Sequence, residues 1–440
     1  MAQPDLDVWM NGELVGTWFR SRTGVAGFRY TDEWLRSVHV RPLSLSLPIP
    51  AGGPELKGSV VEHWFDNLLP DSQRIRDRLR LRFHAGSASP AHLLAAVGRD
   101  CVGAVQLLPS GSAAPRVDLV ESEPLDDRKI ARILRNVTSD APDEDMGEDF
   151  RISIAGAQEK TALLRIGRRW HRPLGATPTT HIFKLPLGLV GNMRADMTTS
   201  VENEWLCAKL LAALGFSVAP SEIAIFQDQK VLIVERFDRR WMDGRRWIAR
   251  LPQEDFCQAL GVPSELKYES DRGPGIAAGL RLLSGGEAPQ DDKLQFVLAQ
   301  LAFWLMAATD GHAKNFSIFI GPRGIYRMTP AYDVLSAWPI IGTGRNQLSP
   351  RRARLAMALR TSNAHYHLHE ISTRHWQALA GQSGVPGAFD KMVELVRSVP
   401  AALDTVEGTL PETFPIMKVW RPVRAGMLAH AAKFNKALPP

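Results

Sequence analysis

The chain has 440 residues, of which 45% are hydrophobic and 23% are charged, and its formal net charge is +6. This length allows two or three domains with full cores, and the composition is that of an ordinary globular protein, which excludes wholesale disorder. The excess of basic residues permits contact with nucleic acid but does not by itself indicate it.

The cysteines and the N-terminus both point away from an oxidising or membrane environment. Cys101, Cys207 and Cys257 are scattered among apolar residues without metal-ligand spacing, which argues against disulfides and against a zinc site. The first residues lack a signal-peptide pattern, and no apolar stretch reaches the roughly 20 residues that span a bilayer. We therefore expect a cytoplasmic protein without a membrane partner.

The first hundred residues predict short strands, turns and a helix. An Asn-Gly pair separates two apolar runs within residues 8–19, which is typical of a β-hairpin, and SLSLPI at 44–49 alternates at the strand period. VVEHWFDNLLPDS at 60–72 predicts a helix that stops at its proline. The polar pair Asp66 and Asn67 near its end is either functional or a solvated helix end.

An acidic, aperiodic segment at 138–149 predicts an exposed loop or a subdomain boundary. The following stretch, FRISIAGAQEKTALLRIG, predicts strands at 151–154 and 161–166 around a turn of small residues. Such a hairpin can cover nucleotide phosphates with its backbone N–H groups, and an ordinary hairpin explains the pattern equally well.

Lys184 lies on a short predicted strand within THIFKLP. A buried ammonium group is costly unless it is paired, so Lys184 either lies on an exposed face or meets an anion such as a phosphate. The helix that follows carries Glu202 and Glu204 in its first turn. Either glutamate pairs with Lys184, as the corresponding residues do in kinases, or both simply complement the helix dipole.

Three further segments have charged residues in positions that could serve a function. VLIVERFDRRW at 231–241 begins as a buried strand and becomes abruptly charged, as expected for a connector between two lobes. KYESDRGPG at 267–275 predicts a polar loop that either faces substrate or lies on the surface. Basic residues and histidines between 345 and 375 either reach DNA phosphates or form a solvated face.

The most informative stretch is ATDGHAKNFSIFIGP, which follows an apolar run at 296–305 that predicts a buried helix. Asp310 and Asn315 are five positions apart, and Asp333 follows about twenty residues later, the order of a kinase base and its magnesium ligands. The same residues also fit a helix end with Gly311 as its terminator and Asn315 capping a turn.

Taken together, these motifs resemble the HipA family of bacterial toxin kinases. The match runs from the N-terminus to beyond Asp333 and rests on RPLSLSLPI, FDNLLPDS, GRDCVGAVQLLP, FRISIAGAQEKTALLRIG, TPTTHIFKLP, ERFDRRW, LPQED, KYESDRGPGI, ATDGHAKNFS and PAYD. The resemblance implies an α+β, two-lobed protein-kinase-like fold. Residues 1–130 would form a β-rich N-terminal subdomain, 131–238 a nucleotide-binding part, and 239–440 a mainly helical catalytic lobe.

The resemblance also implies a serine/threonine protein kinase that uses ATP and Mg²⁺. In this family the toxin is paired with a small DNA-binding antitoxin, HipB, and we expect a HipB-like antitoxin dimer that brings the complex to operator DNA. The family's toxin phosphorylates an aminoacyl-tRNA synthetase, typically the glutamyl enzyme. Uncharged tRNA then accumulates and growth stops in a drug-tolerant, persistent state.

Carried onto this chain, the resemblance makes Asp310 the catalytic base and Asn315 and Asp333 the magnesium ligands. Lys184 becomes the clamp on the nucleotide phosphates. Ser153 corresponds to the position that the family autophosphorylates, where a charge of about −2 would repel ATP and eject the phosphate loop. The other nucleotide-binding positions that it implies are Ala155, Gly156, Ala157, Gln158, Glu159, Lys160, Glu235, Arg236, Phe237, His312 and Tyr332.

Two rival functions stay open from the residues alone. A small-molecule phosphotransferase of the antibiotic-modifying type has the same order of base, Asn and Asp. A DNA-bound co-repressor with a vestigial kinase site would use the basic C-terminal residues, among which Arg374 resembles a DNA-contacting position. The chain also lacks G-x-G-x-x-G and has Thr309 where protein kinases have Arg, so control through an Arg-bound phosphorylated activation loop is not expected.

Overall fold

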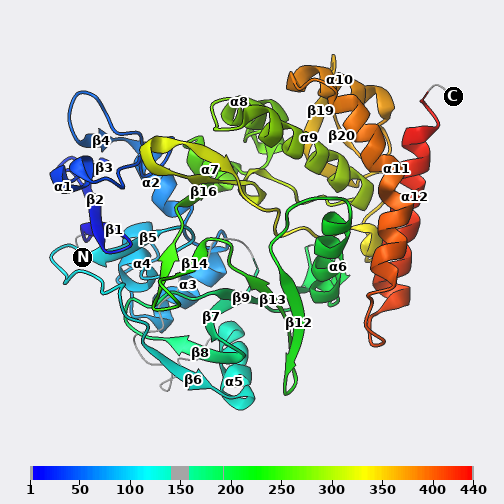
Figure 1. Cartoon of the computed structure of the whole chain (residues 1–440). Coiled ribbons are helices and arrows are strands. Elements are labelled where there is room, and N and C mark those ends of the chain that lie inside the picture. Colours follow the sequence, from blue (N-terminus) through cyan, green and yellow to red (C-terminus); the bar gives the residue numbers. More distant parts are fainter. Residues whose placement is uncertain (1–2, 140–157, 192, 439–440) are drawn as a thin grey trace. The chain divides into compact units, whose positions relative to one another are not determined.

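The computed structural model describes residues 3–139, 158–191 and 193–438 (Figure 1). The chain forms two compact units. Two strands, β12 (Ser221–Phe226) and β18 (Tyr326–Met328), cross the division between them. The first unit comprises Met1–Leu185, Ala224–Glu265 and Ser317–Tyr326, and the second Pro186–Ile223, Leu266–Phe316 and Arg327–Pro440. The three-part division at 130 and 238 stays a prediction, because these units cut the chain at other points.

The N-terminal sheet of the first unit has the strand order β4-β3-β2-β1-β5. Its strands are β1 (Leu6–Met10), β2 (Glu13–Arg20), β3 (Ala26–Tyr30), β4 (Glu55–Lys57) and β5 (Val105–Pro109). The expected hairpin is confirmed, since β1 and β2 pair antiparallel around Asn11 and Gly12, whose φ angles are 47° and 86°. Trp18 of β2 stacks on Phe65 at 4.2 Å between ring centroids, so one face of the sheet is a packed aromatic core.

Four helices accompany this sheet: α1 (Asp32–Arg36), α2 (Ser59–Asp66), α3 (Gln73–Arg82) and α4 (Pro90–Val97). The helix expected at 60–72 is confirmed as α2, although it ends before the proline. The alternative that Asp66 and Asn67 form a solvated helix end is wrong. Asn67 is 1% exposed and donates to the carbonyl of Val262 at 2.9 Å, and the carboxylate of Asp66 pairs with Arg76. Both polar side chains are therefore structural contacts of the first unit.

The strand expected at 44–49 does not form. The Leu45 N–H donates to the Glu254 carboxylate at 2.9 Å, and the Ser46 hydroxyl donates to the carbonyl of Gln258 at 2.6 Å. These partners belong to β16 (Gln253–Asp255) and α7 (Phe256–Ala259). The segment alternates like a strand in sequence, but its burial does not follow this alternation, since Ser44 is fully buried and Ile49 is exposed. Its backbone bonds to side chains instead of a neighbouring strand.

The second sheet of the first unit has the order β12-β13-β9-β7-β8-β6. The predicted strands at 161–166 and around Lys184 are confirmed as β7 and β9. The charged residues of the segment at 231–241 begin at the end of β13, and their role as a connector between lobes stays a prediction. Residues 140–157 lie outside the described structure, and with them most of the acidic segment and the strand expected at 151–154. The remaining elements are β6 (Ser122–Leu125), α5 (Asp127–Thr138), β7 (Lys160–Ile166), β8 (Arg169–Pro173), β9 (His181–Lys184), β12 (Ser221–Phe226), β13 (Gln229–Glu235), β14 (Arg239–Met242), β15 (Trp247–Arg250), β17 (Ser317–Ile320) and β18 (Tyr326–Met328).

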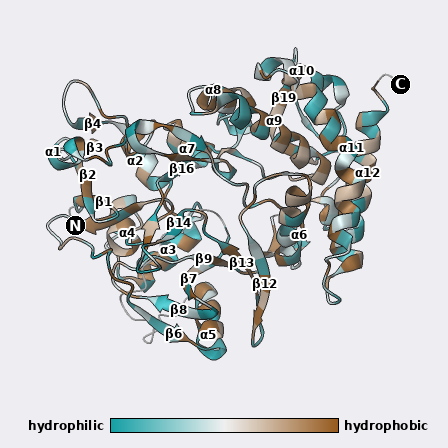
Figure 2. Ribbon diagram, in the orientation of Figure 1, coloured by the Kyte–Doolittle hydropathy of each residue, from teal (hydrophilic) through white to brown (hydrophobic). Residues whose placement is uncertain are grey.

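The second unit is mainly helical, so the α+β class is confirmed. Its elements are β10 (Gly188–Val190), β11 (Ala195–Met197), α6 (Ser200–Ala213), α8 (Ile276–Leu283), α9 (Pro289–Met306), β19 (Arg354–Arg360), β20 (Ala364–His367), α10 (Thr373–Ser383), α11 (Ala388–Glu407) and α12 (Arg421–Asn435). The predicted buried helix is α9, which Figure 2 colours largely as hydrophobic. Its Trp304 is fully buried and contacts Trp376 of α10 and stacks on His430 of α12 at 4.1 Å.

The state of the cysteines agrees with the expectation from the sequence. All three cysteines are free and buried, as expected of packing residues. None of the described helices combines the length and the apolarity that a bilayer crossing requires.

Candidate active site

The central loop of the site begins where α9 ends in the second unit. Ala307 adopts a left-handed conformation with φ of 50°, and the Ala308 N–H donates to the carbonyl of Phe303 at 2.7 Å. Gly311 is therefore not the helix terminator, and the helix-end alternative is wrong on this point. A Cβ atom on Gly311 would lie 2.4 Å from the ring of Phe303, so close packing requires glycine there.

Backbone hydrogen bonds hold the loop in tight turns. The His312 N–H donates to the carbonyl of Asp310 at 2.8 Å, and the Asn315 N–H donates to the carbonyl of His312 at 2.9 Å. Asp310 is exposed, whereas the six residues after it are buried. The loop thus presents one carboxylate to solvent on a rigid support, as a base that receives a proton from substrate requires.

The Asn315 side chain joins the loop to Asp333. Its Nδ2 donates to the carbonyl of Asp310 at 2.9 Å and to the carbonyl of Asp333 at 3.3 Å. These two bonds use both N–H groups of the amide, so the oxygen Oδ1 is left for another partner. The structure therefore brings together the three residues that the sequence singled out, and it offers an amide oxygen of the type that Mg²⁺ prefers.

Asp333 has a φ of 58°, which is uncommon for a residue other than glycine. Its neighbours hold the chain in this conformation. Ala331 exchanges backbone hydrogen bonds with Ser217 and Ala219, and the Tyr332 hydroxyl donates to the carbonyl of Lys314 at 2.9 Å. Strain that the surroundings maintain in this way clusters at functional sites.

Tyr268 is a part of the site that sequence reasoning missed. Its hydroxyl donates to Oδ1 of Asp310, and its ring packs edge-on against His312 with centroids 4.9 Å apart. Of the two alternatives for KYESDRGPG, this contact favours the one in which the loop faces the chemistry. No local pattern distinguishes such a tyrosine from one on a surface loop, because its partner is 42 positions away along the chain.

The first unit supplies a pair of lysines on its second sheet. Lys184 is 6% exposed, so the exposed-face alternative was wrong. It stands directly opposite Lys160 in the register of β7 and β9, which places both side chains on the same face. Like charges in this arrangement repel unless an anion lies near, which favours the alternative in which Lys184 meets an anion.

The described end of the predicted phosphate loop is anchored in the first unit. Arg78 of α3 pairs with Glu159 at 2.7 Å, and the amide of Gln158 donates to the carbonyl of Leu185 at 2.6 Å. Ser153, Ala155, Gly156 and Ala157 lie outside the described residues. The two glutamates considered as partners of Lys184 are buried in α6, in the second unit, with Glu202 alone in its first turn, and their pairing with Lys184 stays a prediction.

Glu235, Arg236 and Phe237 follow one another at the end of β13. Glu235 is exposed, and Phe237 packs edge-on against Phe319 at 5.7 Å between ring centroids. Arg236 is buried, and all five of its guanidinium N–H groups are used by Asp238, Asp100, Thr179 and a backbone carbonyl. A contact of Arg236 with a nucleotide would therefore have to come from its backbone.

Arg236 is one member of a buried cluster of five charges that the sequence did not indicate, together with Asp100, Asp238, Arg239 and Arg250. Asp100 accepts from Arg239 at 2.8 Å and lies 3.4 Å from Arg250. Although burial alone would raise it, these guanidinium groups and that of Arg236 hold the pKa of Asp100 well below its usual range. The cluster joins the segment after α4 to the end of β13.

The basic C-terminal residues have diverse surroundings. Arg374 is exposed on α10, and its Nε lies 3.3 Å from Nε2 of His375. Arg360 instead forms an ion pair with Glu269 at 2.5 Å. Part of this basic stretch therefore stabilises the second unit, and Arg374 is one of its solvent-facing members.

The donor set fits magnesium better than zinc. The described residues contain no group of three or more His, Cys, Asp or Glu side chains that could hold a metal ion by themselves. Oxygen atoms of Asn315 and Asp333 would hold Mg²⁺ only together with nucleotide phosphates, which is how this ion is usually bound in phosphotransferases.

The sequence of the chain matches two models of one protein family. The family model of the HipA N-terminal domain matches residues 6–108, and that of the HipA-like C-terminal domain matches residues 152–403. The chain is 36% identical over 414 residues to the protein named "Putative kinase Y4mE" of Sinorhizobium fredii, with 91% of each chain covered. It is 30% identical over 341 residues to the serine/threonine-protein kinase toxin HipA of Shewanella oneidensis, covering 74% of this chain and 73% of that one.

A solved structure shows the same fold. It is the complex of the Shewanella oneidensis MR-1 toxin–antitoxin proteins HipA and HipB with operator DNA, and it matches with a TM-score of 0.79 and 24% identity. The match covers 98% of this chain and 97% of the other. The two matched domains and the ordered site residues lead to one conclusion: the chain belongs to the HipA family of serine/threonine-protein kinase toxins.

Proposed function

We propose that this chain transfers the γ-phosphate of ATP to protein serine or threonine residues, with Asp310 as its catalytic base. The observation that carries the proposal is the Asn315 amide, which bonds to the carbonyls of both Asp310 and Asp333. Asn315, itself one predicted magnesium ligand, thereby joins the base Asp310 to the other predicted ligand, Asp333, within the second unit. A kinase needs this proximity because base and metal act on one transferring phosphoryl group.

In the proposed mechanism, the exposed carboxylate of Asp310 accepts the proton of the attacking hydroxyl. Tyr268 orients this carboxylate through its hydroxyl hydrogen bond. General-base assistance of this kind contributes a factor of roughly 10² to 10⁴ to the rate. Asn315 and Asp333 would hold Mg²⁺, which, when bound, neutralises charge on the nucleotide phosphates.

For the nucleotide, the proposal assigns the phosphates to the lysines of the first unit. Lys184 and Lys160 share one face of adjacent strands, where two ammonium groups could contact phosphate oxygens. Residues 155–160 would cover the phosphates, and 235–237 would line the adenine site. His312 and Tyr332, which contacts of the catalytic loop hold in place, are the remaining proposed nucleotide-binding residues.

The proposed biological role follows from the family rather than from the geometry. We propose that the substrate is an aminoacyl-tRNA synthetase, the glutamyl enzyme first, and that its phosphorylation halts translation and promotes persistence. Autophosphorylation of Ser153 would silence the enzyme. Because HipA of Shewanella oneidensis occurs in a complex with HipB and operator DNA, we propose a HipB-like antitoxin dimer and operator DNA as partners here, with Arg374 contacting DNA.

The proposal is tested by incubating the purified, folded and unphosphorylated chain with labelled ATP, Mg²⁺ and the aminoacyl-tRNA synthetases of its host. Label on one synthetase and on Ser153, both absent with Asp310→Gln, is the expected result. Label on aminoglycosides instead would identify a small-molecule phosphotransferase. No label on any acceptor, from a chain that still binds operator DNA with its antitoxin, would favour a co-repressor.

A further inference from the structure

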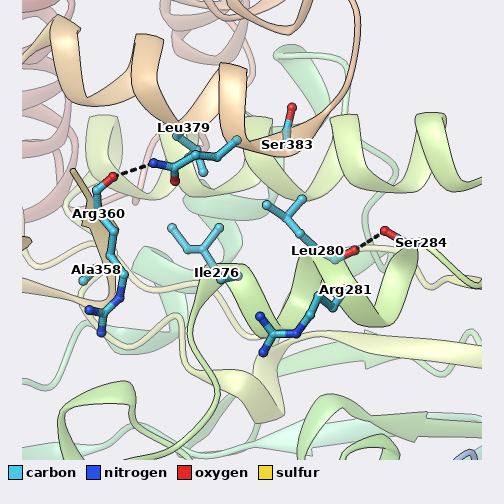
Figure 3. A pocket seen from close by; sticks show the side chains of 10 residues that line it. Ile276, Leu280, Arg281, Ser284, Ala358, Arg360, Leu379 and Ser383 are labelled. Atoms are coloured by element: carbon cyan, nitrogen blue, oxygen red, sulfur yellow. Dashed lines mark hydrogen bonds between the residues drawn. The ribbon is translucent and has the colours of Figure 1, made fainter. Parts of the chain in front are cut away.

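A narrow groove of about 370 Å³ lies on the second unit between α8, β19 and α10 (Figure 3). Its walls are mostly apolar and include Ile276 and Leu280 of α8 and Leu379 of α10. Arg281 and Arg360 also line it, and Figure 3 shows both guanidinium groups pointing toward the same edge of the view. The lining contains no carboxylate. The groove therefore combines an apolar slot with a cationic margin.

The other polar side chains of the groove are engaged within the protein. The hydroxyls of Ser284 and Ser383 donate to carbonyls of their own helices at 2.8 and 2.6 Å, and the Gln382 amide donates to the carbonyl of Arg360 at 2.9 Å. Arg281 is exposed and forms no ion pair with any described residue. Because Arg360 already pairs with Glu269, an occupant would meet the guanidinium group of Arg281 as its main polar partner, which favours an anionic ligand.

The groove is connected to the catalytic loop through Glu269. This carboxylate accepts from Nε of Arg360 at 2.9 Å and from the Ala358 N–H at 2.7 Å. Glu269 directly follows Tyr268, whose hydroxyl binds Asp310. A molecule seated in the groove therefore contacts Arg360, which binds the short loop that carries Tyr268.

We propose that this groove docks a segment of the kinase's protein substrate in which an apolar side chain is flanked by carboxylates. The apolar side chain would enter the slot, and a flanking carboxylate would pair with Arg281. Given the proposed function, the protein substrate is the favoured occupant, because Arg360 in the groove binds Glu269, the neighbour of the Tyr268 that binds Asp310. Docking there would hold the substrate on the unit that carries the base.

The first experiment does not require a known substrate. A peptide library with one fixed leucine and varied flanking residues is selected on the immobilised full chain. We expect enrichment of Glu and Asp beside the leucine. Arg281→Glu should abolish this enrichment, because it reverses a charge at the margin and disturbs no described ion pair.

Two further variants control this result. Arg397→Glu makes the same charge change at an exposed position of α11 outside the groove, so it should keep the enrichment. Ala277→Glu places a carboxylate in the slot at the second position of α8, where a helix N-terminus tolerates it, and should abolish the enrichment. Absence of acidic enrichment with the unaltered chain, or its persistence in Arg281→Glu, would overturn the proposal.

The second experiment identifies the occupant with the synthetase that accepts phosphate. Arg281→Glu should raise the KM for that protein by about five- to tenfold and leave the KM for ATP unchanged. Weakened antitoxin binding with an unchanged KM would assign the groove to the antitoxin and overturn the substrate assignment. Acidic enrichment without any phosphate transfer would support the groove's chemistry while contradicting the proposed kinase function, so the two failures are distinguishable.

Discussion

Two clusters of charged residues in this molecule are built in opposite ways. In the first unit, Asp100, Arg236 and their partners are almost completely buried, and each charge is compensated by ion pairs 2.8 to 3.4 Å long. In the second unit, Asp310 is exposed on a loop whose following residues are buried. There, hydrogen bonds between backbone carbonyls and the Asn315 amide side chain hold the loop in place, and the Asp310 carboxylate stays accessible to solvent.

The difference shows how the surroundings of a charged side chain decide what it can do. A buried ion pair is expensive to break, because removing one partner leaves the other charge buried and uncompensated, so the Arg236 cluster has a structural role. An exposed carboxylate contributes little to stability and stays available to accept a proton. Substitutions in the two clusters should therefore separate stability from activity.

The largest effect should come from Asp310→Asn. Loss of the base should lower the phosphate-transfer rate by roughly 10² to 10⁴, while the melting temperature stays unchanged because the side chain is exposed. Single-turnover transfer rates and thermal melting measure the two quantities. A variant that transfers phosphate at a near wild-type rate would remove Asp310 from the mechanism.

Arg236→Ala should have the opposite profile. Removing this arginine leaves Asp238 and Asp100 buried with fewer partners, which should cost about 3 to 5 kcal/mol of unfolding free energy. Urea unfolding followed by tryptophan fluorescence measures the loss. Arg240→Ala, at an exposed neighbouring position, is the matched control and should change stability by less than about 0.5 kcal/mol.

Glu254 should make the stability of the first unit depend on pH. It is fully buried and binds the Leu45 N–H and the Trp64 indole, and burial raises its pKa from 4.5 to about 7. Because the folded state holds this proton more tightly, the contribution is complete below pH 4.5 and is lost as the pH rises through about 7. The rise in pKa corresponds to roughly 3 kcal/mol.

Unfolding free energies measured between pH 5 and 8 test this expectation. Glu254→Gln imitates the protonated carboxyl group and should flatten the part of the pH dependence that Glu254 causes. An identical pH dependence in both proteins would show that Glu254 does not titrate in this range.

Tyr268→Phe should have a moderate effect on activity alone. Loss of a hydrogen bond to a charged group costs about 1.5 kcal/mol, so kcat should fall roughly tenfold while the KM for ATP stays unchanged. Steady-state kinetics with the accepted protein substrate measure both constants. A raised KM for ATP with an unchanged kcat would contradict the assignment of Tyr268 to the base.

The smallest effect should come from Arg374, an exposed arginine that contrasts with the buried Arg236. If it contacts a DNA phosphate, Arg374→Ala should reduce the slope of log affinity against log salt by about 0.9 for the complex with antitoxin. Filter binding or fluorescence anisotropy over a salt series measures the slope. Equal slopes would exclude the contact.

The patterns that could be interpreted correctly from the sequence are local ones. The Asn-Gly hairpin and the buried helix α9 depend on residues that are close along the chain or follow one period. The strand expected at 44–49 failed for the same reason. Its apolar alternation does not match burial, since Ser44 is buried and Ile49 is exposed, and the partners of its backbone, such as Glu254, are about two hundred positions away.

By itself, the sequence determined the α+β class, the family and the identity of the candidate base and magnesium ligands. Only the tertiary structure decided that Tyr268 binds Asp310, that Lys160 stands opposite Lys184, and that an arginine expected beside adenine has no free guanidinium donor. The physical reason is that hydrogen bonds and ion pairs depend on distance in space, whereas the sequence records only separation along the chain.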